Sequence, residues 1–109
     1  MGWVKPCFSP IYGSTKSISA TDSSASVELL ADQGDTLLVT NLGDNVVYVE
    51  LGGSSVAATT ADLPILPSTA QTINLSSGFG GGPAKHSYAA AICGAGETAT
   101  VKFTSGYGV

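Results

Sequence analysis

Arginine is absent from this chain of 109 residues, and charged residues of all kinds make up only 11% of it. An ordinary soluble domain is about a quarter charged. The positive charges are four lysines, Lys5, Lys16, Lys85 and Lys102, which are scattered along the sequence. A protein that follows a phosphate backbone needs a stripe of basic side chains, and this spacing does not supply one. Direct binding to nucleic acid is therefore not expected.

Histidine and cysteine are also scarce, because the sequence has one histidine, His86, and two cysteines, Cys7 and Cys93. Any Ser-His-Asp or Cys-His mechanism would have to use His86, and no serine lies in a Gly-x-Ser-x-Gly turn. No His-x-x-x-His or Cys-x-x-Cys pair offers the spacing of a metal site. We therefore expect a protein that is not an enzyme and that carries no cofactor.

Two groups of polar residues resemble binding sites only in part. Lys85 follows a run of glycines, but Ala84 and His86 stand where a phosphate-binding P-loop needs Gly and Ser or Thr. Several aspartates could share a calcium ion, yet no Asp-x-Asp-x-Asp-Gly loop is present, and aspartates are common in turns for their own sake. These aspartates are Asp22, Asp32, Asp35 and Asp44.

The sequence also lacks any apolar run near the roughly 18 residues that cross a bilayer. Pro6 and Pro10 interrupt the N-terminal region, which has no continuous apolar stretch of the signal-peptide kind. We therefore expect that the protein does not associate with a membrane. We also expect that it is made in the cytoplasm and stays soluble. In that compartment Cys7 and Cys93 are more often small buried apolar residues, with a disulfide between them as the alternative.

Residues that favour β-strands are abundant, and they occur in short alternating runs separated by Gly, Pro, Asn and Asp. Alternation places Val47 with Val49, and Val101 with Phe103, on faces directed to the core. No segment favours a long helix. Strands are expected at residues 17–20, 26–30, 35–42, 46–51, 71–75, 87–93 and 98–104.

Two short links in this pattern predict β-hairpins. Gly43-Asp44-Asn45 joins 35–42 to 46–51, and Gly94–Glu97 joins 87–93 to 98–104. Because no helix is available for parallel crossovers, we expect an all-β fold, with a single antiparallel β-sandwich or small jelly roll of about seven to eight strands. This domain is expected to span residues 15–109.

The N-terminal residues 1–14 lie outside the strand pattern and hold Trp3, Phe8 and Tyr12 among Gly and Pro. They predict an extended arm that packs on another surface. Aromatic side chains dominate protein interfaces, so these three are candidate anchors.

Two further segments do not alternate as central strands do. In residues 52–70, Leu63–Pro67 is expected to be an extended edge or a packed loop, because each proline removes a ladder hydrogen-bond donor. Residues 76–86 hold four glycines and predict a loop with one exposed aromatic, Phe79.

Three tyrosines are spread over three strand regions, because Tyr48 and Tyr88 fall on predicted strands and Tyr107 follows the strand predicted at 98–104. They are expected at protein interfaces or rims, since a tyrosine ring buries area while its hydroxyl reaches water. The alternative is a row of rings on one sandwich face, as in sugar-binding modules. The candidate interface residues are thus Trp3, Phe8, Tyr12, Tyr48, Phe79, Tyr88 and Tyr107.

Residues 36–109 resemble the small virion structural proteins of tailed bacteriophages, especially head decoration or cement proteins. Three stretches carry the resemblance: TLLVTNLGDNVVYVELGG, AATTADLPILPSTAQTINL and YAAAICGAGETATVKFTSGYGV. Residues 1–35 are not covered. Members of this group are small β-sandwiches or jelly rolls that oligomerise and bridge shell subunits on the capsid. The likeness brings no catalytic or cofactor residues.

The resemblance implies a homodimer or homotrimer that binds a major capsid protein on the outer surface of the virion head, after synthesis in the host cytoplasm. Deletion of residues 1–12 is then expected to leave a folded oligomer that no longer co-sediments with capsids. A neck, tail or fibre-base component is the first alternative. A carbohydrate-binding module or adhesin is the second.

Overall fold

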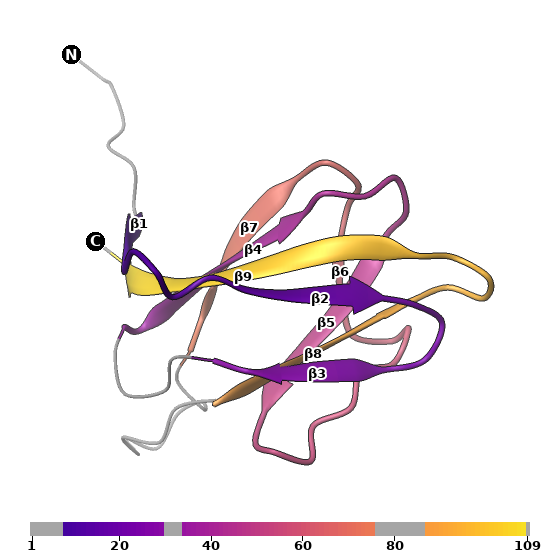
Figure 1. Cartoon of the computed structure of the whole chain (residues 1–109), viewed down its shortest axis with the longest axis horizontal. Coiled ribbons are helices and arrows are strands. Elements are labelled where there is room, and N and C mark those ends of the chain that lie inside the picture. Colours follow the sequence, from indigo (N-terminus) through magenta and orange to yellow (C-terminus); the bar gives the residue numbers. More distant parts are fainter. Residues whose placement is uncertain (1–7, 30–33, 76–86, 109) are drawn as a thin grey trace.

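The computed structural model describes residues 8–29, 34–75 and 87–108, and every structural statement below concerns this part of the chain. It forms strands and no helix (Figure 1). The strands are β1 (Phe8–Pro10), β2 (Lys16–Ala20), β3 (Ala25–Glu28), β4 (Thr36–Asn41), β5 (Val47–Gly52), β6 (Leu63–Ile65), β7 (Ala70–Asn74), β8 (Tyr88–Cys93) and β9 (Ala99–Gly108). The predicted all-β class is confirmed. Each predicted strand is found within two residues of its expected bounds, except that β9 runs on to Gly108.

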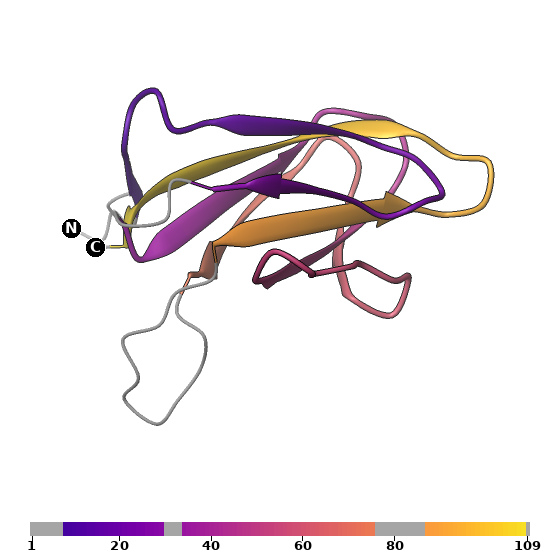
Figure 2. The same cartoon turned by 60° about the horizontal axis from the view of Figure 1, so that its bottom comes forward.

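The strands form two antiparallel sheets that face each other as layers (Figure 2). Sheet A has the order β1-β9-β4-β7, with β2 also paired to β9, and sheet B has the order β3-β8-β5-β6. The chain changes sheet at every link from β2 to β5, continues in the same sheet from β5 to β6, and changes again at every link to β9. This order is that of an eight-stranded jelly roll, with β1 as an addition.

The two predicted hairpins are wrong, because each link changes sheet instead of pairing its own flanking strands. The link from β4 to β5 is an arch, a connection that passes from one sheet to the other. Asn41 is fully buried there, and its side chain stabilises the arch. Its Nδ2 donates to the carbonyl oxygens of Asn45 (2.8 Å) and of Ile65 in sheet B (2.9 Å). Its Oδ1 accepts from the N–H of Gly43 (2.9 Å). The turn-forming residues 43–45 are compatible with a hairpin within one sheet or with an arch between two sheets. The hydrogen bonds of the buried Asn41 side chain favour the arch.

The link Gly94–Glu97 behaves in the same way and carries the chain from β8 in sheet B to β9 in sheet A. It is held to the link between β2 and β3 rather than to its own strands. The N–H of Cys93 donates to the carbonyl oxygen of Thr21 (2.7 Å), and the N–H of Gly96 donates to Oδ2 of Asp22 (3.2 Å).

The core lies between the two sheets and follows the predicted alternation. Val47, Val49, Val101 and Phe103 are all buried, which confirms the expected core faces. Side chains of this kind each contribute about 1.5–3 kcal/mol when fully buried. The cluster comprises Ile18, Ala20, Leu29, Leu37, Val39, Val47, Val49, Ile65, Leu75, Ala89, Ala91, Cys93, Ala99, Val101 and Phe103.

Leu63–Ile65 forms β6, which is an edge strand of sheet B, as the prolines indicated. Pro64 lies opposite Tyr48 in the register with β5. An edge strand tolerates proline because the missing N–H would point away from the sheet.

Part of the predicted N-terminal arm belongs to sheet A. Phe8–Pro10 forms β1, whose register with β9 runs from Phe8 opposite Gly108 to Pro10 opposite Gly106. Between β1 and β2 the strand pairing with β9 is interrupted, and the buried Ser14 side chain supplies hydrogen bonds to β9 instead. The Ser14 hydroxyl accepts from the N–H of Ser105 (3.1 Å) and donates to the carbonyl oxygen of Ser105 (3.2 Å). Residues 1–7 of the predicted arm lie outside the described residues.

Candidate functional site

The most exposed aromatic side chains of the described chain lie at the corner where β1 meets the end of β9 (Figure 1). We call Phe8, Tyr12 and Tyr107 the aromatic corner. Tyr12 is 91% exposed and Tyr107 is 49% exposed. Tyr107 lies opposite Ser9, and Tyr12 follows Ile11, whose N–H donates to the carbonyl oxygen of Ser105 (2.8 Å). The backbone ladder therefore places these residues in one region.

Phe8 is held more firmly than the two tyrosines, because its half-buried ring lies over Gly106. A Cβ atom at Gly106 would come within 2.8 Å of the Phe8 ring and would also meet the backbone oxygen of Ser9. Glycine at this position thus allows β1 and its aromatic ring to approach β9 closely. Phe8 stabilises the corner, while Tyr12 and Tyr107 remain available for a partner.

Tyr48 and Tyr88 lie elsewhere, on the outer face of sheet B, and both are half-buried. Tyr48 is opposite Ile92, and Tyr88 is opposite Gly52, so Ala90 separates their positions along β8. Ala90 faces outward yet is fully buried.

The connection between β5 and β6, residues 53–62, lies against the outer face of sheet B. Within it the N–H of Ala58 donates to Oγ of Ser24 (2.8 Å), which lies just before the opposite edge strand β3. The connection therefore crosses the outer face of sheet B, and it is visible as the pink loop beneath β8 in Figure 2. Since Tyr107 belongs to sheet A, the three tyrosines do not form one row on one face.

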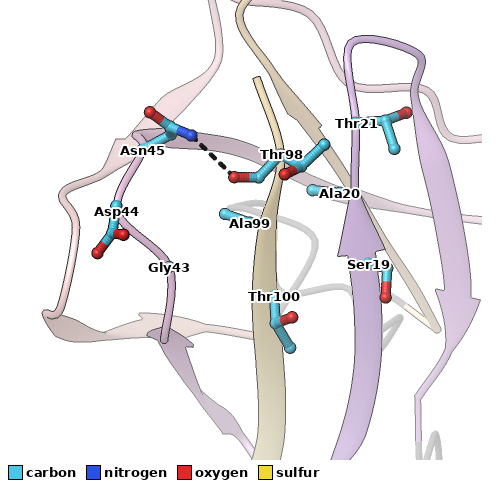
Figure 3. A pocket seen from close by; sticks show the side chains of 9 residues that line it. All are labelled: Ser19, Ala20, Thr21, Gly43, Asp44, Asn45, Thr98, Ala99 and Thr100. Atoms are coloured by element: carbon cyan, nitrogen blue, oxygen red, sulfur yellow. Dashed lines mark hydrogen bonds between the residues drawn. The ribbon is translucent and has the colours of Figure 1, made fainter. Parts of the chain in front are cut away.

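An open groove of about 470 Å³ lies at the end of the sandwich where three sheet-changing links meet (Figure 3). Its lining is small and mostly polar, and Asp44 is its one charged residue. Asn45 Nδ2 spans part of it by donating to the carbonyl oxygen of Thr98 (2.9 Å). The nine lining residues are Ser19, Ala20, Thr21, Gly43, Asp44, Asn45, Thr98, Ala99 and Thr100. The groove offers hydroxyl, amide and carboxylate groups for hydrogen bonds.

Two ionisable side chains have shifted pKa values. A side-chain hydrogen bond with Asp62 raises the pKa of the exposed Glu50 carboxyl, and slight desolvation and the negative charge of Asp62 raise it further. Asp62 is itself committed as an acceptor, because its Oδ2 receives the N–H of Thr59 (2.7 Å). Burial, followed by the charge of Glu97, raises the pKa of the free Cys93 thiol, which favours its unreactive protonated form.

No three of the His, Cys, Asp and Glu residues that the structure describes gather closely enough to hold a metal ion. Asp22, Asp35 and Asp44 of the calcium reading therefore do not form a shared site within this part of the chain. The calcium, phosphate-binding and catalytic hypotheses also involve residues outside the described part of the chain, namely Asp32, Lys85 and His86.

Trp3 and Phe79 also lie outside the described residues, so their interface roles stay predictions. Phe8 and Tyr107 lie on the paired strands β1 and β9, on opposite faces of the sheet, and Tyr12 follows β1, while Tyr48 and Tyr88 lie on the outer face of sheet B. The sequence pattern did not single out Ser14 or Asn41, since a lone polar residue among turn formers gives no local signal of burial.

The described ranges contain no helix that is long and apolar enough to cross a membrane. Comparisons with protein-family models, with curated proteins and with solved structures gave no match for this chain.

Proposed function

We propose that this chain is a non-enzymatic virion structural protein, a capsid decoration protein that forms a homodimer or homotrimer and binds a major capsid protein on the outside of a phage head. The resemblance of residues 36–109 to such proteins motivates the proposal. The observation that carries it is the aromatic corner, in which Tyr12 is 91% exposed and Tyr107 is 49% exposed.

Exposed tyrosines of this kind are suited to anchoring a protein contact. A tyrosine side chain buries a large rigid area at low cost in conformational entropy, while its hydroxyl satisfies a polar neighbour. Tyr107 lies opposite Ser9 on β9, and Tyr12 follows Ile11, which is bonded to Ser105 of the same strand, so a partner surface over this end of β9 can contact both tyrosines. Interfaces depend on a few such residues for most of their affinity.

The scarcity of charge supports a role in a repeated assembly. Only 11% of the residues are charged, so large parts of the surface can be dehydrated without burying unpaired ions. Many copies on a regular lattice would add weak contacts into stable attachment. The jelly roll is compatible with this role because it occurs in viral capsid domains, although it also occurs in lectins, and a fold alone does not fix a function.

The test is co-sedimentation of the purified protein with undecorated heads of the phage that encodes it. We expect saturable binding, and a loss of at least tenfold in affinity when Tyr12→Ser and Tyr107→Ser are combined. Leu66→Ser is the matched control, since Leu66 is another apolar side chain with 58% exposure and lies in the connection after β6. Its binding should equal that of the unaltered chain.

Other outcomes would contradict this proposal in distinct ways. Binding to purified tails or necks but not to heads would favour the neck, tail or fibre-base alternative. Binding to a glycan array that is lost in Tyr48→Ala or Tyr88→Ala, with no affinity for heads, would favour the carbohydrate-binding alternative. Binding to heads that is equally strong in the double tyrosine variant would remove the aromatic corner from the contact.

A further inference from the structure

The four edges of the two sheets differ in how they discourage pairing with another chain. Natural edge strands are commonly protected by proline or charge. Pro64 protects β6, Glu28 lies in β3, and Pro10 and Lys16 lie in β1 and β2 on the far edge of sheet A. Among the described edge strands, β7 (Ala70–Asn74, AQTIN) is the one with neither proline nor charge.

The hydrogen-bond phase of β7 shows which of its backbone groups point outward. The N–H of Asn41 donates to the carbonyl oxygen of Thr69, and the N–H of Leu75 donates to that of Asp35, both at 2.9 Å. In an antiparallel ladder the bonded residues alternate. Gln71 and Ile73 are therefore bonded to β4, while the N–H and C=O of Thr72 point away from the sheet.

We propose that a second copy of this chain pairs with β7 in antiparallel fashion about a two-fold axis at Thr72, so that sheet A continues through both molecules. A strand that pairs with its own copy must be self-complementary under a two-fold rotation. With the axis at Thr72, the two Thr72 residues exchange backbone hydrogen bonds, and Gln71 of each copy lies opposite Ile73 of the other.

The side chains and charges of β7 fit this occupant. Ile73 is half-buried against the core, and across the axis it lies diagonal to Ile73 of the second copy, within reach of apolar contact. The whole chain carries a net charge of −4, so two copies repel each other over most approaches. An edge without charged residues lets them meet with the least repulsion.

This inference deepens the homodimer-or-homotrimer part of the proposed function by naming the strand through which two copies pair, and it does not depend on binding to a capsid. A dimer through β7 forms in solution whether or not heads bind, so its failure and the failure of the proposed function are seen in different assays. It also leaves the aromatic corner open, because β1 and β7 are opposite edges of sheet A.

The first experiment measures sedimentation velocity over a concentration series for the full chain and for Thr72→Pro. Proline at this position removes an outward N–H and no bond to β4, so we expect a folded protein whose dimer is at least tenfold weaker. Ser26→Pro is the matched control on β3. Its N–H also points outward, because the N–H of Leu29 donates to the carbonyl oxygen of Ser87 and sets the phase.

A second experiment does not depend on tolerating proline. Thr72→Cys in a Cys7→Ser chain should form a covalent dimer on mild oxidation. Thr104→Cys, on the outer face of β9, should not. A wild-type chain that stays monomeric at all concentrations would overturn the proposal. So would a dimer that survives in folded Thr72→Pro, or a Thr72→Cys chain that cross-links no faster than Thr104→Cys.

Discussion

Ser105, in the middle of sheet A, has hydrogen-bonded backbone groups and, within the described part of the chain, an unpaired side-chain hydroxyl. Its backbone N–H and C=O are bonded by the Ser14 hydroxyl, while its own Oγ is buried with no hydrogen-bond partner among the described residues. An unpaired buried hydroxyl costs free energy because it has lost its bonds to water.

We predict that Ser105→Ala raises the free energy of unfolding by about 1 kcal/mol, since it removes the unpaired hydroxyl and keeps the backbone bonds. Urea denaturation followed by circular dichroism measures this change. Ser14→Ala is the opposite case, because it leaves the buried backbone groups of Ser105 without the Ser14 hydroxyl. It should lower the free energy of unfolding by about 1–2 kcal/mol. A loss of stability in Ser105→Ala would show that its Oγ has a partner.

Glu50 gives a pH-dependent prediction, because the Asp62 hydrogen bond raises its pKa in the folded state. A raised carboxyl pKa means that the folded protein binds the proton more tightly than the unfolded chain does. The resulting stabilisation is fully present below the unfolded pKa of glutamate and is lost as the pH rises through the raised folded pKa. Glu50→Gln should remove this part of the pH dependence.

The measurement is the melting temperature across that pH window, at low salt because Glu50 is exposed and screening weakens the effect. Relative to the unaltered chain, Glu50→Gln should gain stability at neutral pH and not at acidic pH. Glu28→Gln removes the same charge from the same face of sheet B and serves as the control. A parallel shift in both variants would attribute the change to net charge rather than to the contact with Asp62.

At the scale of strands, alternation of residue types identified the positions of the strands but not their partners. Val101 and Phe103 lie on the core face as expected, because alternation is a local consequence of strand geometry. Pairing is different, since turn formers such as Gly43 allow either a hairpin or an arch. The choice depends on Asn41 reaching the Ile65 carbonyl oxygen across the sandwich, a contact 24 residues apart that no short window reports.

The candidate site was predictable only in part, for the same reason. Phe8, Tyr12 and Tyr107 could be selected as interface residues by type, but their proximity follows from the pairing of β1 with β9. The separation of Tyr48 from Tyr88 depends on the register of β5 with β8, which places Ala90 between them and which no local pattern reports. Residue type predicted the candidates, and topology decided which of them share a surface.

Two glycines with positive φ allow the cost of backbone strain to be separated from the cost of a steric clash by an added Cβ atom. Gly13 (φ 86°) has nothing near the position of an added Cβ, whereas a Cβ at Gly34 (φ 83°) would meet the backbone oxygen of Gly106. We predict that Gly13→Ala lowers the free energy of unfolding by about 1 kcal/mol through backbone strain alone. Gly34→Ala should cost about 3 kcal/mol, because the start of β4 must also move away from β9.

Thermal or urea denaturation of the two alanine variants measures this difference. Equal costs at Gly13 and Gly34 would mean that the chain between β3 and β4 yields without disturbing sheet A. The comparison therefore tests how firmly the link into β4 is fixed against Gly106.

At the scale of the whole molecule, the N-terminal segment divides into two parts that a truncation series can separate. Residues 1–7 precede the described structure, whereas Phe8–Pro10 forms β1 and Tyr12 follows it. Removal of 1–7 keeps the ladder between β1 and β9 and keeps the aromatic corner. Removal of 1–12 takes away a strand of three residues, but β9 remains paired with β2 and β4.

We therefore predict that the chain lacking residues 1–12 stays folded, with a lower melting temperature, and still dimerises through β7 on the opposite edge of sheet A. It should lose co-sedimentation with heads, because Phe8 and Tyr12 are gone. The chain lacking residues 1–7 separates the two contributions. If it also fails to bind, Trp3 and its neighbours carry the contact, and if it binds normally, the aromatic corner does. Head binding by the chain without residues 1–12 would contradict both, since no candidate anchor upstream of β2 would remain.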